Sequence, residues 1–196
     1  MTRVVENFTT QVPVWSPYIR PVELASATPE QLAAMQVTPS NKGVSPYVLT
    51  LAHDPESLAV RSPLFNQIMY GKDGLSSAER ELGAVGASVV NRCIYCAAVH
   101  ASRFNNLSKR PDVIDEIFDR ERQAKLEPRD QAIFDFSAQL SETPPAIPEA
   151  AAANLANAGL NTLEAVDLVL SSALFGWANR LMHTLGEPTE REPSQR

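Results

Sequence analysis

Both cysteines of the chain and one of its three histidines lie within a span of eight residues. Cys93, Cys96 and His100 occur in the run NRCIYCAAVH at residues 91–100. Spacings of three, four and seven residues return to one face of an α-helix, so this pattern places two thiols and an imidazole on one stripe. A redox dithiol needs a thiolate, a second thiol to close a disulfide and a proton acceptor. The sequence therefore predicts dithiol redox chemistry in this segment.

A carboxylate is expected to complete this group from the preceding helix. If the chain reverses near residues 90–92, the two helices run antiparallel and Glu81 falls opposite His100. A carboxylate that accepts a hydrogen bond from one imidazole nitrogen fixes the tautomer and leaves the other nitrogen as a base. His100 would then take the Cys96 proton, directly or through a water. Cys93 lies one turn the other way, placed to attack a sulfenic acid on Cys96.

Local signals around this hairpin support the same interpretation. Ser76 and Glu79 form a capping box, which leaves Glu81 without a local role. Asn91 is a good N-cap for the cysteine-bearing helix, and thiols in the first turns of a helix gain from its positive end. The small residues at 83–88 (GAVGAS) predict a close approach of the two helices of the hairpin.

The remaining pattern is helical, without sustained period-two alternation, and predicts an all-α fold. Residues 1–44 are expected to form an extended N-terminal arm with one short helix, 45–185 the helical domain and 186–196 a polar, frayed C-terminal tail. The last helix is apolar on nearly every side, which predicts that it is buried centrally or in a subunit interface. Cap residues and proline or glycine stops predict helices from Thr28, over 55–70, from Ser76, from the cysteines to about 104–107, and over 111–122, 128–140, 148–158 and from Asn161.

Composition restricts the class of protein. A hydrophobic content of 44% with 20% charged residues is typical of a soluble globular chain, and the formal net charge of −6 disfavours nucleic acid and anionic membranes as partners. Residues 1–8 lack the apolar run of a signal peptide, and the most apolar segment, 165–178, is shorter than the ~20 residues of a membrane span. We therefore expect a cytoplasmic protein, in which a close cysteine pair is more often catalytic or metal-binding than a structural disulfide.

The residues of the hairpin resemble a known family. The stretch LSSAERELGAVGASVVNRCIYCAAVH at 75–100 is similar to the AhpD-like alkylhydroperoxidases of the carboxymuconolactone decarboxylase superfamily, and most closely to its peroxidase-related branch. Weaker similarity extends over 45–185. The resemblance implies an AhpD-like helical bundle that assembles as trimers or hexamers. It also implies that Cys96 attacks peroxide, Cys93 resolves, and Glu81 and His100 relay protons. Tyr95 stands where well-studied members carry a histidine, which shortens the relay by one group.

The function implied is a cofactor-free dithiol peroxidase that reduces alkyl hydroperoxides or hydrogen peroxide, with an external dithiol or protein as reductant and an antioxidant role. One alternative is a thiol–disulfide oxidoreductase that uses the same residues. Another is a carboxymuconolactone decarboxylase-like protein without peroxidase activity, and a third is an oligomeric helical protein with a vestigial site. A zinc site would need His53 or His183 as a fourth ligand from a distant part of the sequence, so no metal is expected.

Overall fold

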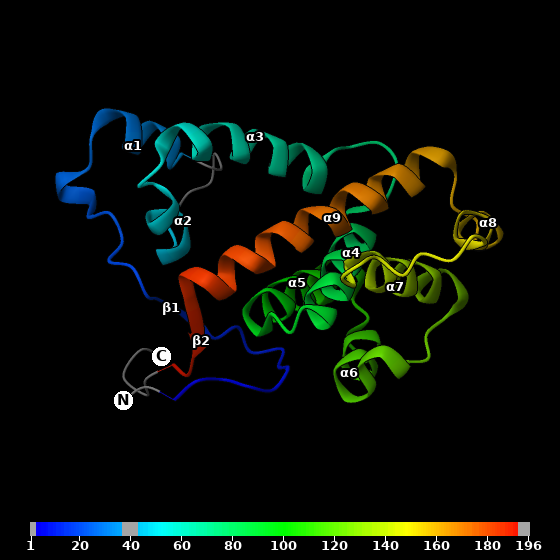
Figure 1. The fold of residues 1–196 in the computed structure, drawn as a ribbon. Helices are drawn as coiled ribbons and strands as arrows, with labels where there is room; N and C mark the ends of the chain where they lie inside the picture. The colour runs from blue at the N-terminus through cyan, green and yellow to red at the C-terminus, as the bar shows by residue number, and fades with distance from the viewer. Residues whose placement is uncertain (1–2, 37–42, 192–196) are drawn as a thin grey trace.

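The computed structural model describes residues 3–36 and 43–191, and this part of the chain is predominantly helical (Figure 1). The predicted all-α fold is confirmed. Residues 1–2, 37–42 and 192–196 of the expected arm and tail lie outside the described residues. The helices are α1 (Pro29–Ala34), α2 (Pro46–Leu51), α3 (Pro55–Tyr70), α4 (Ser77–Val90), α5 (Ile94–Ser108), α6 (Pro111–Arg120), α7 (Pro128–Ser141), α8 (Ala151–Asn157) and α9 (Thr162–Leu185), and the strands are β1 (Val14–Pro17) and β2 (Gly186–Thr189).

Most predicted helix starts are confirmed by their capping hydrogen bonds. The side chains of Thr28, Asp54, Ser76 and Asn161 each accept a backbone N–H from the first turn of the helix that follows. Such caps satisfy N–H groups that have no partner inside the helix. The helix predicted over 148–158 is shorter in the structure, where α8 begins at Ala151 and ends at Asn157.

Helix α4 is the centre of the bundle, and every residue from Arg80 to Val89 is buried. It packs against α5, α7 and α9. Its glycines do not serve the α4–α5 contact that the sequence predicted. A Cβ on Gly83 would lie 3.1 Å from Leu168 of α9, and one on Gly86 would lie 3.0 Å from Ser137 of α7. The glycines point to these other neighbours because α4 is surrounded by helices, so its small residues are spread around the axis.

Gly86→Ala is expected to lower the free energy of unfolding by about 1–3 kcal/mol, because the added methyl group would overpack the contact between α4 and α7. Gly176→Ala in α9 is the matched control. A Cβ there meets only the end of the Arg180 side chain at 3.6 Å, so the change is expected to stabilise the helix by up to about 1 kcal/mol. Urea unfolding of both variants measures the difference. Equal effects in the two variants would contradict the packing argument.

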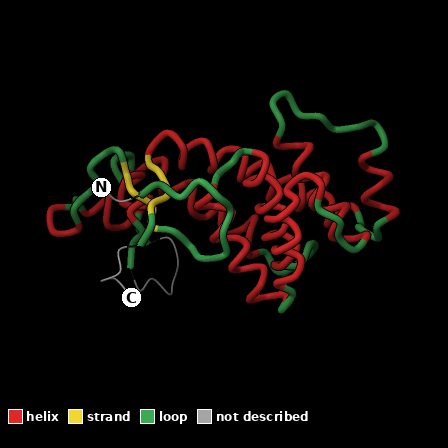
Figure 2. The backbone as a smooth tube through the Cα atoms, turned by 90° about the horizontal axis from the view of Figure 1, so that it is seen from below, coloured by secondary structure: helices red, strands yellow, loops and turns green. Residues whose placement is uncertain are grey.

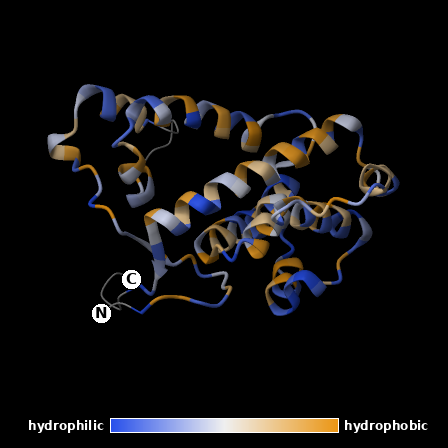
Figure 3. Cartoon of the chain, viewed as in Figure 1, coloured by the Kyte–Doolittle hydropathy of each residue, from blue (hydrophilic) through white to orange (hydrophobic). Residues whose placement is uncertain are grey.

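Helix α9 crosses the molecule between two groups of helices (Figure 1). Helices α1, α2 and α3 lie on one side, and α4, α5 and α7 lie on the other. Helix α9 contacts α4, α7 and α3, but several of its large apolar side chains are exposed in the single chain. Of the two predicted alternatives, burial in a subunit interface stays a prediction. Figure 3 shows apolar segments along the outer helices as well as inside the bundle. The exposed apolar residues of α9 are Leu163, Val166, Val169, Leu170 and Trp177.

Assembly into trimers or hexamers stays a prediction, for which the exposed face of α9 offers apolar surface. None of the helices in the described part of the chain combines the length and the apolar content needed to cross a membrane.

Strands β1 and β2 form an antiparallel ribbon at one end of the molecule (Figure 2). The expectation of a frayed tail is therefore wrong for residues 186–189. Strands of four residues are too short to show period-two alternation in the sequence. The ribbon is stabilised by tertiary contacts. Trp15 donates a hydrogen bond from its indole nitrogen to the carbonyl of Met182, 3.3 Å away. Gly186 allows this packing, since a Cβ there would lie 2.5 Å from the Trp15 ring.

Candidate active site

The turn between α4 and α5 sets the position of the first cysteine. Asn91 is the C-cap of α4, and Arg92 follows in the left-handed region with a φ of 54°. The backbone N–H of Cys93 then bonds to the carbonyl of Ser88 at 2.9 Å, which closes the end of α4. Cys93, not Asn91 as the sequence predicted, is the N-cap residue of α5. The difference arises because the chain reverses at the left-handed Arg92, one residue after the predicted cap.

The hairpin brings Glu81 and His100 together as predicted. His100 Nδ1 donates a hydrogen bond to Oε2 of Glu81, and both side chains are buried, with exposed fractions of 5% and 2%. Nη1 of Arg103 lies 3.7 Å from the other carboxylate oxygen. Because a carboxylate oxygen only accepts hydrogen bonds, the neutral imidazole carries its proton on Nδ1. Nε2 is therefore the nitrogen that can accept a proton.

Aromatic rings hold the imidazole from the side of α9. The ring centroids of His100 and Phe175 are 4.2 Å apart in an edge-to-face arrangement. The ring centroids of Phe175 and Phe65 of α3 are in turn 6.0 Å apart. The imidazole is therefore fixed by a carboxylate on one side and an aromatic ring on another. Sequence analysis missed these rings, since apolar residues at helical spacing do not reveal which of them face a site.

Both cysteines are free thiols and both are buried. Hydrogen bonding with the Cys96 side chain lowers the pKa of Cys93 against the opposing effect of burial. The same interaction, together with burial, raises the pKa of Cys96 well above its usual value. The first proton lost by the pair therefore leaves a thiolate centred on Cys93, with the Cys96 thiol as its hydrogen-bond donor.

Cys96→Ala is expected to raise the pKa of Cys93, because it removes the hydrogen-bond donor that stabilises the thiolate. Cys96→Ser is the matched control, since it keeps a hydroxyl donor at the same place. A thiolate is lost as the pH falls through its pKa, so absorbance at 240 nm should disappear at a higher pH in Cys96→Ala than in Cys96→Ser. Identical titration curves for the two variants would contradict this account.

A cover of apolar and aromatic side chains encloses the dithiol. Trp15 of β1, Tyr47 of α2 and Met182 of α9 belong to the same buried cluster as the two cysteines. The rings of Trp15 and Tyr47 meet edge to face at 5.5 Å. Tyr95 is partly buried against this cluster. The sequence leaves open whether it lines the pocket or fills the core.

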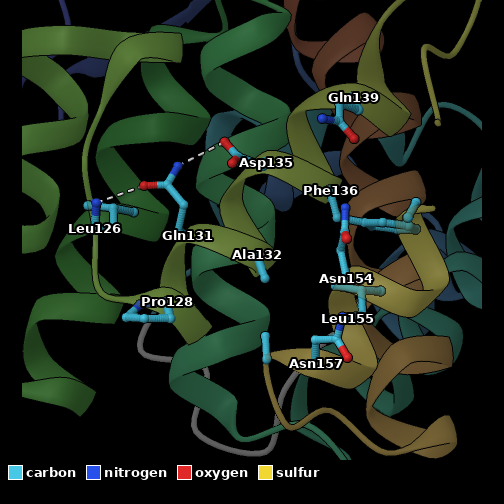
Figure 4. Close-up of a pocket in the computed structure, with 12 residues that line it drawn as sticks. Leu126, Pro128, Gln131, Ala132, Asp135, Phe136, Gln139, Asn154, Leu155 and Asn157 are labelled. Carbon is cyan, nitrogen blue, oxygen red and sulfur yellow. Dashed lines mark hydrogen bonds between the residues drawn. The ribbon is translucent and has the colours of Figure 1, made fainter.

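A hollow of about 410 Å³ lies between α7 and α8 (Figure 4). There the side chain of Gln131 accepts from the backbone N–H of Leu126 at 2.8 Å and donates to Asp135 at 3.0 Å. Neither cysteine lines this hollow.

The two other histidines have structural partners. His53 Nε2 bonds to the carbonyl of Arg20, and His183 Nε2 bonds to the carbonyl of Asn91, each at 2.9 Å. The second contact ties α9 to the turn that precedes Cys93. Within residues 3–36 and 43–191, no three His, Cys, Asp or Glu side chains gather in a way that would hold a metal ion.

Comparisons with known proteins agree with the hairpin and the fold. The model of the carboxymuconolactone decarboxylase family matches residues 55–139, which include the dithiol, Glu81 and His100. A crystal structure described as an alkylhydroperoxidase AhpD core, an uncharacterized peroxidase-related protein from Ralstonia eutropha JMP134, superimposes with a TM-score of 0.75. It is 28% identical, over 89% of this chain and 92% of that one. Over residues 55–139 the chain is therefore similar to the carboxymuconolactone decarboxylase family, and its fold is similar to that of AhpD-like structures.

Other structures share the fold of this AhpD-like chain. An uncharacterized peroxidase-related protein from Silicibacter sp. TM1040 has a TM-score of 0.72 and 24% identity, over 88% of this chain and 94% of that one. The debrominase Bmp8 has a TM-score of 0.70 and 17% identity, over 90% of each chain. No curated protein matches the AhpD-like sequence.

Proposed function

We propose that the chain is a dithiol peroxidase that reduces alkyl hydroperoxides or hydrogen peroxide. The observation that carries the proposal is the buried Glu81–His100 pair, because it lies on the same helical hairpin as the two thiols. His100 follows Cys96 by one helical turn on α5, which supports a role for its Nε2 in taking a proton from this thiol, directly or through a water.

The pKa order of the thiols and the family resemblance favour different cysteines as the reactive thiolate. The lowered pKa favours Cys93 as the thiolate of the pair, whereas the resemblance assigns the attack on peroxide to Cys96. Transfer of the shared proton from Cys96 to Cys93 reconciles the pKa order with the assignment that the resemblance implies. It creates the Cys96 thiolate and leaves Cys93 as a thiol that can supply a proton to the leaving group. His100 provides a second route for the same proton.

The chemistry then balances in two steps. The Cys96 thiolate attacks the O–O bond of ROOH, the leaving oxygen takes a proton to give ROH, and Cys96 becomes a sulfenic acid. The Cys93 sulfur attacks the sulfenic sulfur, which releases water and closes the Cys93–Cys96 disulfide. An external dithiol or protein reductant must return two electrons and two protons to restore both thiols. The protein's own residues supply the chemistry, and the mechanism includes no cofactor or metal.

A thiol–disulfide oxidoreductase is the second candidate. The lowered pKa of Cys93, at the N-cap of α5, is a property of the attacking thiol in disulfide exchange. Reaction with disulfides but not with peroxides would favour this candidate.

Intact mass and free-thiol titration test the proposal. The reduced protein is exposed briefly to one equivalent of an organic hydroperoxide. The expected result is rapid loss of both thiols with a decrease of about two daltons, the mass of the two hydrogens removed when a disulfide forms. Unchanged thiols in the folded protein would overturn the peroxidase proposal and direct attention to disulfide substrates.

A further inference from the structure

Arg61 is a cation without a counter-charge next to the cover of the dithiol. Its guanidinium carbon lies 4.4 Å from the ring centroid of Phe65 and 6.0 Å from that of Tyr47. Its Nε is buried with no hydrogen-bond partner, and among the described residues no carboxylate lies within 4.0 Å of the guanidinium. Other arginines of the bundle do have such partners: Arg80 pairs with Asp167, and Arg129 with Glu79 and Glu164.

Tyr47 carries a second unpartnered polar group at the same place. Its hydroxyl is buried and makes no hydrogen bond, although buried polar groups are normally paired. Burial raises the pKa of Tyr47 to about 12, the charge of Arg61 acts to lower it, and the charges of Cys96 and Cys93 raise it further. The Tyr47 ring lies 6.0 Å from the guanidinium of Arg61 and belongs to the same buried cluster as both cysteines.

Arg61 does not act as the counter-ion of the thiolate. The pKa of Cys93 is lowered by Cys96, and the causes of both thiol shifts lie in the pair itself and its burial. The arginine is nevertheless on the side of the catalytic imidazole, because Phe65 beneath it contacts Phe175, which contacts His100. With both cysteines reduced, the guanidinium of Arg61 has no carboxylate partner, and the hydroxyl of Tyr47 has no hydrogen-bond partner.

We propose that Arg61 and Tyr47 bind the carboxylate of an organic hydroperoxide whose peroxide group reaches the dithiol. This inference rests on the proposed peroxidase function and names its substrate class. A guanidinium presents paired N–H donors that match one carboxylate, and the phenol adds a third donor. The apolar side chains of Trp15, Leu58 and Met182, in the same cluster as Tyr47 and the cysteines, suit the hydrocarbon part of such a molecule.

Matched hydroperoxides test the selectivity. The rate of thiol loss is measured with a long-chain fatty acid hydroperoxide and with its methyl ester, which lacks the charge. The wild-type protein is expected to react at least tenfold faster with the acid. In Arg61→Met the acid-to-ester ratio is expected to fall to about one. Arg120→Met removes a half-exposed arginine of α6 and should keep the ratio. A ratio that survives in Arg61→Met would overturn the inference.

A binding measurement separates this inference from the peroxidase proposal. Octanoate and 1-octanol are titrated into the reduced protein by calorimetry, which needs no reaction. We expect saturable octanoate binding that weakens at least tenfold in Arg61→Met and less strongly in Tyr47→Phe, with no such change for octanol. Peroxide-driven thiol loss without octanoate binding would overturn the inference alone. Octanoate binding without thiol loss would overturn the peroxidase proposal and leave Arg61 and Tyr47 as a carboxylate site for a molecule other than a hydroperoxide.

The stability of Arg61→Met provides a further readout. Removing this partly buried cation, which has no carboxylate partner, should leave the melting temperature nearly unchanged, because the desolvation that opposes folding offsets the contacts of the guanidinium with the rings of Phe65 and Tyr47. A lower melting temperature would indicate that Arg61 stabilises the fold instead of serving a ligand, and would overturn the proposal.

Discussion

Cys96→Ser is expected to abolish peroxide turnover, while Cys93→Ser permits one oxidation and then stops. The serine hydroxyl is not oxidised by peroxides, so the first variant has no atom at position 96 to accept the oxygen. In the second variant, Cys96 becomes a sulfenic acid that no neighbouring thiol can resolve. Its mass should rise by about 16 daltons, the mass of one oxygen, and a sulfenate-specific probe should label Cys96.

Wild-type steady-state activity in both serine variants would contradict the mechanism. A sulfenate found on Cys93, in a Cys96→Ser protein that still consumes one equivalent of peroxide, would reverse the roles of the two cysteines. That outcome would agree with the lowered pKa of Cys93 and would contradict the assignment that the family resemblance implies.

Glu81→Gln is expected to lower the rate of peroxide reduction on the order of a hundredfold, in line with the usual contribution of a positioned acid or base. The glutamine side chain keeps the shape of Glu81, but its amide can donate to Nδ1 of His100 and reverse the tautomer. Nε2 would then carry the proton and could no longer accept one. The pH profile of the rate should change as well, which a purely structural role would not cause.

Glu79→Gln is the matched control for this variant. Glu79 caps α4 by accepting from the backbone N–H of Ser76 at 3.0 Å and forms an ion pair with Arg129. Its replacement should lower the stability and leave the rate of thiol oxidation in the folded protein near the wild-type value. Similar rates in the Glu81 and Glu79 variants would contradict a role for Glu81 in the proton relay.

The sequence predicts the helices and the central pairing well because both follow from local rules. Capping residues such as Ser76 and Asn161 mark helix starts through hydrogen bonds within four residues. The contact between Glu81 and His100 follows from helical spacing together with one chain reversal, so it needed no knowledge of the rest of the fold.

Features that depend on distant segments could not be predicted in this way. Arg92 takes a left-handed conformation without being glycine, so nothing in its residue type marks the turn that makes Cys93 the N-cap. Trp15 shares a buried cluster with the dithiol from a segment nearly eighty residues earlier in the chain, and Arg61 of α3 lies against the ring of Tyr47 in that cluster. Such contacts are set by tertiary packing, which residue spacing does not encode.

The hydrogen bond between Trp15 and Met182 joins residues that are 167 positions apart. Contacts at such separations form late in folding, because closing a long loop costs much conformational entropy. The α4–α5 hairpin is local by comparison, and during synthesis it leaves the ribosome well before α9 does. We therefore expect a stage of synthesis at which both cysteines have left the ribosome but α9, which carries Met182 of the cover, has not. At that stage the cysteines meet any oxidant in the surroundings, before the folded protein can select among substrates.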